Sequence, residues 1–95
     1  MNTPPERNPP LRERLLDVNG LEPPEPMERA LDALADLPPG HYLRMLLHRE
    51  PYLLYPMIEE DGFRFETRPG RHALFEILIW RAGDEAAERA ALASR

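Results

Sequence analysis

The sequence predicts an α+β fold: a two-layer sandwich in which two helices cover one face of a four-stranded mixed sheet, in the order β-α-β-α-β-β. Three observations support this prediction. Glycine and prolines separate a strand-like segment from an amphipathic helical segment within residues 15–34. A run that is apolar on both faces occupies residues 41–48. Two alternating segments flank a Pro-Gly pair within residues 63–80.

The first strand is expected at residues 12–18, where Leu16 and Val18 alternate with polar neighbours. The helix that follows is expected to begin at Pro26, because the missing N–H of proline would have no helical partner in the first turn. The Pro-Pro-Gly sequence at residues 38–40 ends this helix. Its apolar stripe has helical spacing and comprises Met27, Ala30, Leu31, Leu34 and Leu37.

The second strand is predicted at residues 41–48, where Arg44 is the one break in a central apolar run. Apolar residues on both faces are typical of a strand in the middle of a sheet. A second helix is expected at residues 53–61, with Gly62 as its C-terminal cap. Because Pro56 cannot lie deep inside a straight helix, we expect an irregular first turn.

A hairpin closes the predicted sheet. Its first strand alternates at residues 63–67, its turn spans residues 68–72, and its second strand covers residues 73–80. In the last strand, one face is expected to carry Phe75, Ile77 and Ile79, and the other Leu74, Glu76, Leu78 and Trp80.

We therefore divide the chain into three parts. Residues 1–11 contain four prolines and are expected to form a flexible, solvated arm. Residues 12–82 form the α/β domain. Residues 83–95 are an alanine-rich tail that either forms a short helix capped by Asp84 or frays, because so short a helix is marginal without packing.

Composition excludes several classes of function. The 95 residues include no cysteine, which excludes disulfides, zinc-thiolate sites and thiol catalysis in this chain. The formal net charge is -5 and no basic cluster occurs, so we expect no nucleic-acid partner. No long apolar run is present, so we expect no membrane association and a cytoplasmic location.

The segment LLDVNGLEPPEP at residues 15–26 carries a family resemblance. It resembles the strand, turn and helix start of the small TusA-like (SirA-like) sulfur-carrier proteins, whose signature is a glycine, a short spacer and Cys-Pro-x-Pro. In this chain Gly20 is followed by a spacer and then by Pro23, which occupies the position of the sulfur-bearing cysteine. Residues 48–63 look like the matching block of cysteine-lacking, uncharacterised bacterial relatives.

The resemblance covers residues 15–82 and implies the TusA-like fold. It also implies a module that docks onto enzymes but cannot deliver sulfur through a cysteine. We therefore expect a small non-catalytic interaction or accessory module, with a role near redox or sulfur metabolism suggested by the family likeness.

Topology predicts where a site would lie. A right-handed crossover makes the first two strands parallel, so their carboxyl ends meet at one edge of the sheet, where ligands tend to bind. We expect a polar cluster for a ligand or partner at this edge, formed by Asp17, Asn19, Gly20, Glu22, Glu25, His48, Arg49 and Glu50.

Alternative functions of this cluster remain open. His48 and Glu50 are residue types that bind divalent cations, although their spacing is not diagnostic, so a metal- or small-ligand-binding domain is the alternative function. The same pair could act as an oriented acid or base, but no nucleophile or paired-carboxylate motif accompanies it. We expect no catalytic residue and no cofactor.

The second face of the sheet suggests a partner surface. If both helices cover one face, the other exposes an apolar surface, which usually marks a protein partner or a homodimer interface. Alternatively, the arm or the tail folds over this face. The interface residues expected there are Tyr42, Leu46, Leu78 and Trp80.

Overall fold

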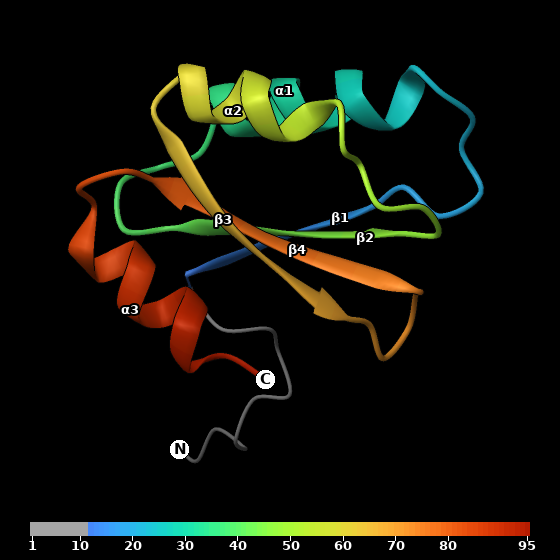
Figure 1. Ribbon diagram of the computed structural model, residues 1–95. Coiled ribbons are helices and arrows are strands. Elements are labelled where there is room, and N and C mark those ends of the chain that lie inside the picture. Colours follow the sequence, from blue (N-terminus) through green and yellow to red (C-terminus); the bar gives the residue numbers. More distant parts are fainter. Residues whose placement is uncertain (1–11) are drawn as a thin grey trace, which may run out of the picture.

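A computed structural model describes residues 12–95, so the expected flexible arm at residues 1–11 lies outside the described residues. The fold is α+β, as predicted, with a four-stranded sheet and three helices (Figure 1). None of the helices in the described part of the chain is long and apolar enough to cross a membrane. The elements are β1 (Glu13–Asp17), α1 (Glu25–Ala35), β2 (Tyr42–Leu47), α2 (Leu54–Glu60), β3 (Phe63–Pro69), β4 (Phe75–Arg81) and α3 (Glu85–Ala93).

The sheet is mixed and has the strand order β1-β2-β4-β3. β1 and β2 run parallel, with Glu13 opposite Tyr42, whereas β4 runs antiparallel to both β2 and β3. The prediction of a central second strand is confirmed, since all residues of β2 are buried. The crossover through α1 brings the carboxyl ends of β1 and β2 to the same edge.

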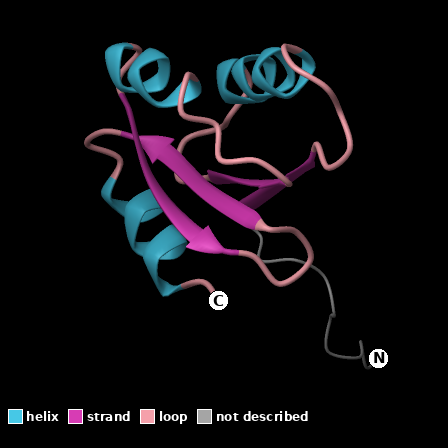
Figure 2. Ribbon diagram, turned by 45° about the vertical axis from the view of Figure 1, so that its right-hand side comes forward, coloured by secondary structure: helices cyan, strands magenta, loops and turns pink. Residues whose placement is uncertain are grey.

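Helices α1 and α2 lie side by side on one face of the sheet (Figure 2). The boundaries follow from the local sequence: Pro26 lies in the first turn of α1, and Gly62 ends α2 with a positive φ of 90°. The main core fills the space between these helices and the sheet. Its buried members include Val18, Leu34, Leu43, Met45, Leu54, Ile58, Ile77 and Ile79.

Helix α3 adds a third layer on the opposite face (Figure 1). The predicted cap is present, because Asp84 Oδ1 accepts a hydrogen bond from the Ala87 N–H at 3.1 Å. Asp84 Oδ2 accepts another from the Gly40 N–H at 2.8 Å, and these backbone donors lower the pKa of Asp84. At the far end, Arg68 Nη1 donates to the Ser94 carbonyl at 2.8 Å. Hydrogen bonds therefore attach both ends of the tail at residues 83–95 to the rest of the domain.

This helix corrects the expectation of an exposed apolar face. Tyr42, Leu78 and Trp80 pack under Ala87 and Ala91, and all five residues are buried. Alanine side chains are small, so the helix axis approaches the sheet closely and excludes water from the aromatic rings. Of the two outcomes the sequence left open, the tail covers this face. The fourth expected interface residue, Leu46, is buried as well.

A buried charge network lies on the same face and was missed by the sequence analysis. Arg44 Nε donates to Glu13 Oε1 at 2.9 Å, and Arg44 Nη1 donates to Glu76 Oε1 at 2.5 Å. Tyr42 also donates to Glu13 Oε1, at 2.7 Å. The three charged side chains are only 7 to 10% exposed. One guanidinium therefore satisfies two carboxylates across three strands.

Candidate functional site

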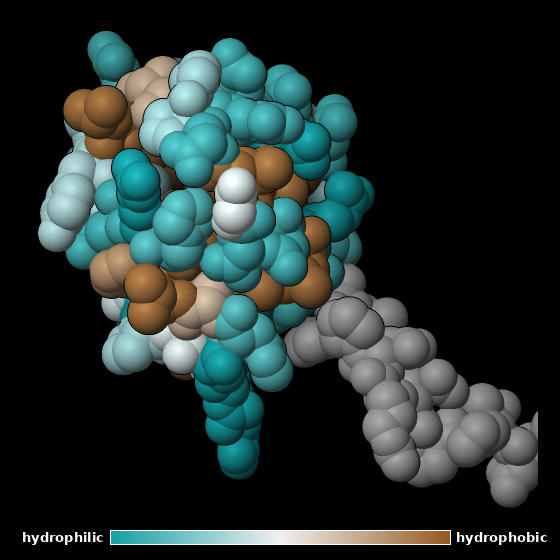
Figure 3. Space-filling model, turned by 90° about the vertical axis from the view of Figure 1, so that its right-hand side faces the viewer, coloured by the Kyte–Doolittle hydropathy of each residue, from teal (hydrophilic) through white to brown (hydrophobic). Residues whose placement is uncertain are grey.

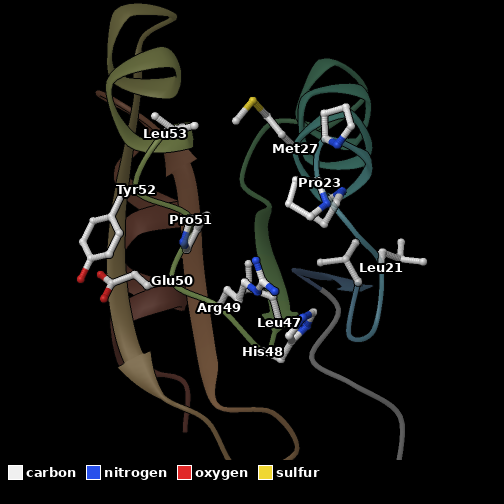
Figure 4. A pocket seen from close by; sticks show the side chains of 13 residues that line it. Leu21, Pro23, Met27, Leu47, His48, Arg49, Glu50, Pro51, Tyr52 and Leu53 are labelled. Atoms are coloured by element: carbon white, nitrogen blue, oxygen red, sulfur yellow. The ribbon is translucent and has the colours of Figure 1, made fainter.

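A pocket of about 270 Å³ opens at the carboxyl edge of β1 and β2, between the starts of α1 and α2 (Figure 4). We call it the edge pocket. One wall comes from the turn before α1 and from its first residues, and the other from the segment between β2 and α2. It is lined by Val18, Leu21, Pro23, Pro24, Pro26, Met27, Leu47, His48, Arg49, Glu50, Pro51, Tyr52 and Leu53.

A hydrogen bond joins the turn after β1 to the residue that follows β2, beside the edge pocket. The Gly20 N–H donates to His48 Nδ1 at 3.2 Å, and the positive φ of 81° at Gly20 suits glycine at this turn. Asp17 Oδ1 accepts from the Asn19 N–H at 3.0 Å, which closes the turn after β1. The structure thus brings together residues 17–20 and His48, which the topology had placed at one edge.

His48 acts as a brace in this arrangement. Because Nδ1 accepts a hydrogen bond from Gly20, the neutral ring carries its proton on Nε2. The Nδ1 lone pair is therefore already engaged by the backbone. This geometry does not offer a second nitrogen lone pair to a metal ion or a substrate proton.

The Glu50 side chain is held by Tyr55 of α2, which in turn contacts β3. The Tyr55 hydroxyl donates to Glu50 Oε2 at 3.0 Å and lies 2.6 Å from the Thr67 hydroxyl, while its ring stacks on Phe65 with centroids 4.1 Å apart. Burial is the main factor that raises the pKa of Tyr55 to about 12, so the phenol stays protonated and donates. Glu50 is therefore oriented by a tyrosine, and no hydrogen bond joins it to His48 within residues 12–95.

Metal binding gains no further support from the surroundings. Within residues 12–95, no group of three or more His, Asp or Glu side chains is placed to hold a metal ion. The pair His48 and Glu50 thus stands without a third protein ligand nearby, whereas protein sites for transition metals usually supply three or four.

A second hollow adjoins the edge pocket and contains the other predicted acids. We call it the acidic groove; it has a volume of about 520 Å³ and shares Pro23 and Pro24 with the edge pocket. Glu25 accepts from Arg29 Nη2 at 3.0 Å, one turn along α1. The groove is lined by Glu22, Pro23, Pro24, Glu25, Glu28, Arg29 and Asp32.

Exposed apolar side chains extend the edge pocket onto the surface. Leu53 is 77% exposed and Tyr52 69%, and both line the pocket. Figure 3 views the molecule from this side, where brown apolar side chains lie among hydrophilic ones. The helical stripe predicted Met27 as a core residue, and no pattern in the sequence indicated a site role for Leu21 or Leu53. A signal for the pocket was available, because prolines at positions 23, 24 and 51 interrupt regular structure close to Leu21 and Leu53.

The comparisons with known proteins agree with this architecture. The model of a family described as "Uncharacterized conserved protein (DUF2249)" matches residues 15–81. The chain belongs to the DUF2249 family. Its match ends before α3, so the helix that covers the second sheet face lies outside the matched region. The search of curated proteins gives no match.

This DUF2249 chain is also similar to the crystal structure of a SirA-like protein from Desulfitobacterium hafniense. The two share 26% sequence identity and a TM-score of 0.60, over 68% of this chain and 92% of that one. The predicted relation to the SirA-like and TusA-like proteins is therefore confirmed. The chain has no cysteine, and Pro23 lies exposed between the edge pocket and the acidic groove.

Proposed function

We propose that this DUF2249 chain is a small non-catalytic module that binds a protein partner at the edge pocket. The supporting observation is an open apolar pocket at the start of α1, the place where the sulfur carriers of this fold would present their thiol. In this chain Pro23 occupies that place, so the proposed module would recognise a partner without transferring a group to it. A role near redox or sulfur metabolism is proposed from the family likeness.

The energetics favour a partner side chain as the main anchor. Burial of a Leu, Met or Phe side chain in an apolar pocket contributes about 1.5 to 3 kcal/mol. Tyr52 and Leu53 border the pocket and are largely exposed, so a partner that covers them removes further apolar surface from water. Aromatic and apolar anchors at the centre of an interface commonly dominate its affinity.

Site-specific photocrosslinking tests this proposal. The photoreactive residue p-benzoylphenylalanine is placed at Leu53, and in a control protein at Leu74, which is 68% exposed and lies before β4. Irradiation in cells of the native host should give a protein adduct from position 53 that position 74 does not give. Identical adducts from both positions, or none from position 53, would count against the proposal.

A small apolar ligand is the second candidate, favoured by the concave shape of the edge pocket. Its volume of about 270 Å³ lies near the lower end of ligand sites in proteins. Native mass spectrometry of protein purified from its host tests this candidate. A bound small molecule that is lost in Leu53→Arg but kept in Leu74→Arg would support it, whereas an unliganded mass in all three proteins would argue against it.

A further inference from the structure

We infer that the partner segment at the edge pocket carries a large apolar side chain for the pocket and an arginine or lysine for the acidic groove. This inference rests on the proposed function and specifies the partner's chemistry. It follows from the position of the two hollows, which share Pro23 and Pro24 as a common border. A segment that crosses these prolines presents one side chain to each hollow.

The charges of the acidic groove point to a basic group. Its lining holds four carboxylates and one guanidinium. Arg29 is paired with Glu25, while Glu22, Glu28 and Asp32 are exposed and make no ion pair within residues 12–95. The unmatched negative charge would favour an arginine, whose planar donors suit carboxylates in pairs.

The local fold explains why these carboxylates can gather. Glu22, Glu25 and Glu28 lie at or just before the N-terminal turn of α1, where the helix dipole favours negative charge. The folding of α1 therefore offsets part of their mutual repulsion. A bound cation would offset the rest, whereas an acidic peptide or a nucleic acid would add to the repulsion.

The overall charge of α1 and α2 has the same sign as the acidic groove. Glu59, Glu60 and Asp61 are exposed at the end of α2, and Arg29 is the one basic residue in α1 and α2. These three residues lie at the end of α2 away from the edge pocket and do not line it, so they add only to the overall negative charge of α1 and α2. Such a field attracts a basic segment and raises its rate of association at low salt.

Peptide titrations of the full-length protein, followed by NMR of the backbone amides, test the inference. The probe is an acetylated, amidated decapeptide with two leucines flanked by two arginines. One control peptide replaces the arginines with glutamate, and another replaces the leucines with serine. We expect the probe to shift the amides of Leu21, Glu28 and Leu53 and to bind about tenfold or more tightly than either control. Its affinity should fall as salt is raised, since exposed charges are screened.

Matched variants assign the binding to the two hollows. The double variant Glu28→Gln with Asp32→Asn should lower the affinity for the probe peptide by about fivefold or more. The control Glu59→Gln with Glu60→Gln changes the net charge equally and should change this affinity by less than about twofold. Leu53→Ser should lower the affinity for the probe peptide, and Leu74→Ser should leave it unchanged. All six substituted side chains are exposed, so the variants are expected to stay folded.

The possible results distinguish two claims: that the partner segment is basic, and that the edge pocket binds a partner. If the glutamate peptide shifts the pocket amides and binds as tightly as the probe, the basic preference is wrong while binding at the pocket stands. If no peptide shifts these amides, the inference is overturned, and photocrosslinking from position 53 still decides the function. If the probe binds and Leu53→Ser has no effect, both are overturned.

Discussion

Arg44 is a charged residue in the middle of β2, one of the two central strands, and its side chain is only 10% exposed. Its two carboxylate partners come from the neighbouring strands on either side. A buried ion pair contributes little net stability compared with apolar residues of the same shape, but the loss of one partner is costly. We therefore expect the network to favour the observed register of three strands more than it adds net stability.

Removal of the arginine should destabilise the protein strongly. In Arg44→Ala, Glu13 and Glu76 remain buried without their cation, and we expect a loss of about 3 to 5 kcal/mol in the free energy of unfolding. Urea denaturation followed by circular dichroism measures this loss. Arg64→Ala, an exposed change on β3, serves as the control and should stay within about 0.5 kcal/mol of the wild type. Equal effects of the two changes would contradict this role.

Glu76 should make stability depend on pH. Burial alone would raise the pKa of Glu76, but the Arg71 N–H and the Arg44 guanidinium together lower it below the ordinary value of 4.5. The ionised form is therefore favoured in the folded state. Its stabilisation is complete above pH 4.5 and is lost as the pH falls through the lower folded pKa.

The measurement is the unfolding midpoint in urea from neutral pH to below the ordinary carboxyl range. We expect Glu76→Gln to be less stable than the wild type at neutral pH and to show a smaller loss on acidification. A wild type and a variant with parallel pH profiles would contradict the expectation. Glu59→Gln, at an exposed position, controls for the change in net charge.

At the scale of elements, periodicity predicted most of the fold. The alternation around Leu16 and the helical stripe from Met27 placed β1 and α1 within two residues of their observed bounds. The docking of α3 could not be predicted, because the stability of a short alanine-rich helix depends on what it packs against. A clue to the sheet face beneath it was present, since Arg44 and Glu76 interrupt two central strands with opposite charges.

The packing of α3 depends on small side chains, and this can be tested with glutamine substitutions. Ala87 is fully buried against Trp80, so Ala87→Gln should separate helix and sheet at a cost of about 2 kcal/mol or more. Trp80 is the one tryptophan of the chain, and its fluorescence should shift to the red as water reaches it. Ala93→Gln, at an exposed position of the same helix, should leave both the fluorescence and the stability unchanged.

The edge pocket shows what sequence reasoning can and cannot supply. The predicted parallel pairing of β1 and β2 places Gly20 and His48 at one edge of the sheet, and the structure confirms that they meet there. The pocket itself depends on how far the starts of α1 and α2 lie apart. Leu21 and Met27 pack against the main core, and no spacing in the sequence specifies this tertiary packing.

At the scale of the whole molecule, negative charge gathers on one side. Arg29 is the one arginine in α1 and α2, whereas β2, β3, β4 and α3 carry several, among them Arg44, Arg64, Arg68, Arg81 and Arg89. The net charge of -5 is therefore unevenly distributed, with the excess of acid over the helix layer. A basic partner would approach this layer first.

Sedimentation should find the full chain monomeric at micromolar concentration. Both faces of the sheet are packed against helices, and the exposed apolar side chains are scattered except around the edge pocket. Residues 12–83 alone would uncover Trp80 and Tyr42 and should self-associate. A dimer of the full chain that persists in Leu53→Ser would contradict this expectation.

Each face of the sheet is covered by its own hydrophobic cluster, and this separation affects how the sequence can evolve. Substitutions beneath α3 and those near the helix starts affect separate hydrophobic clusters, so their effects on folding should be nearly independent. Substitutions could therefore change the residues around the edge pocket while the cluster beneath α3 keeps the fold stable. The third layer would thus give the chain room to exchange one recognition surface for another without losing its shape.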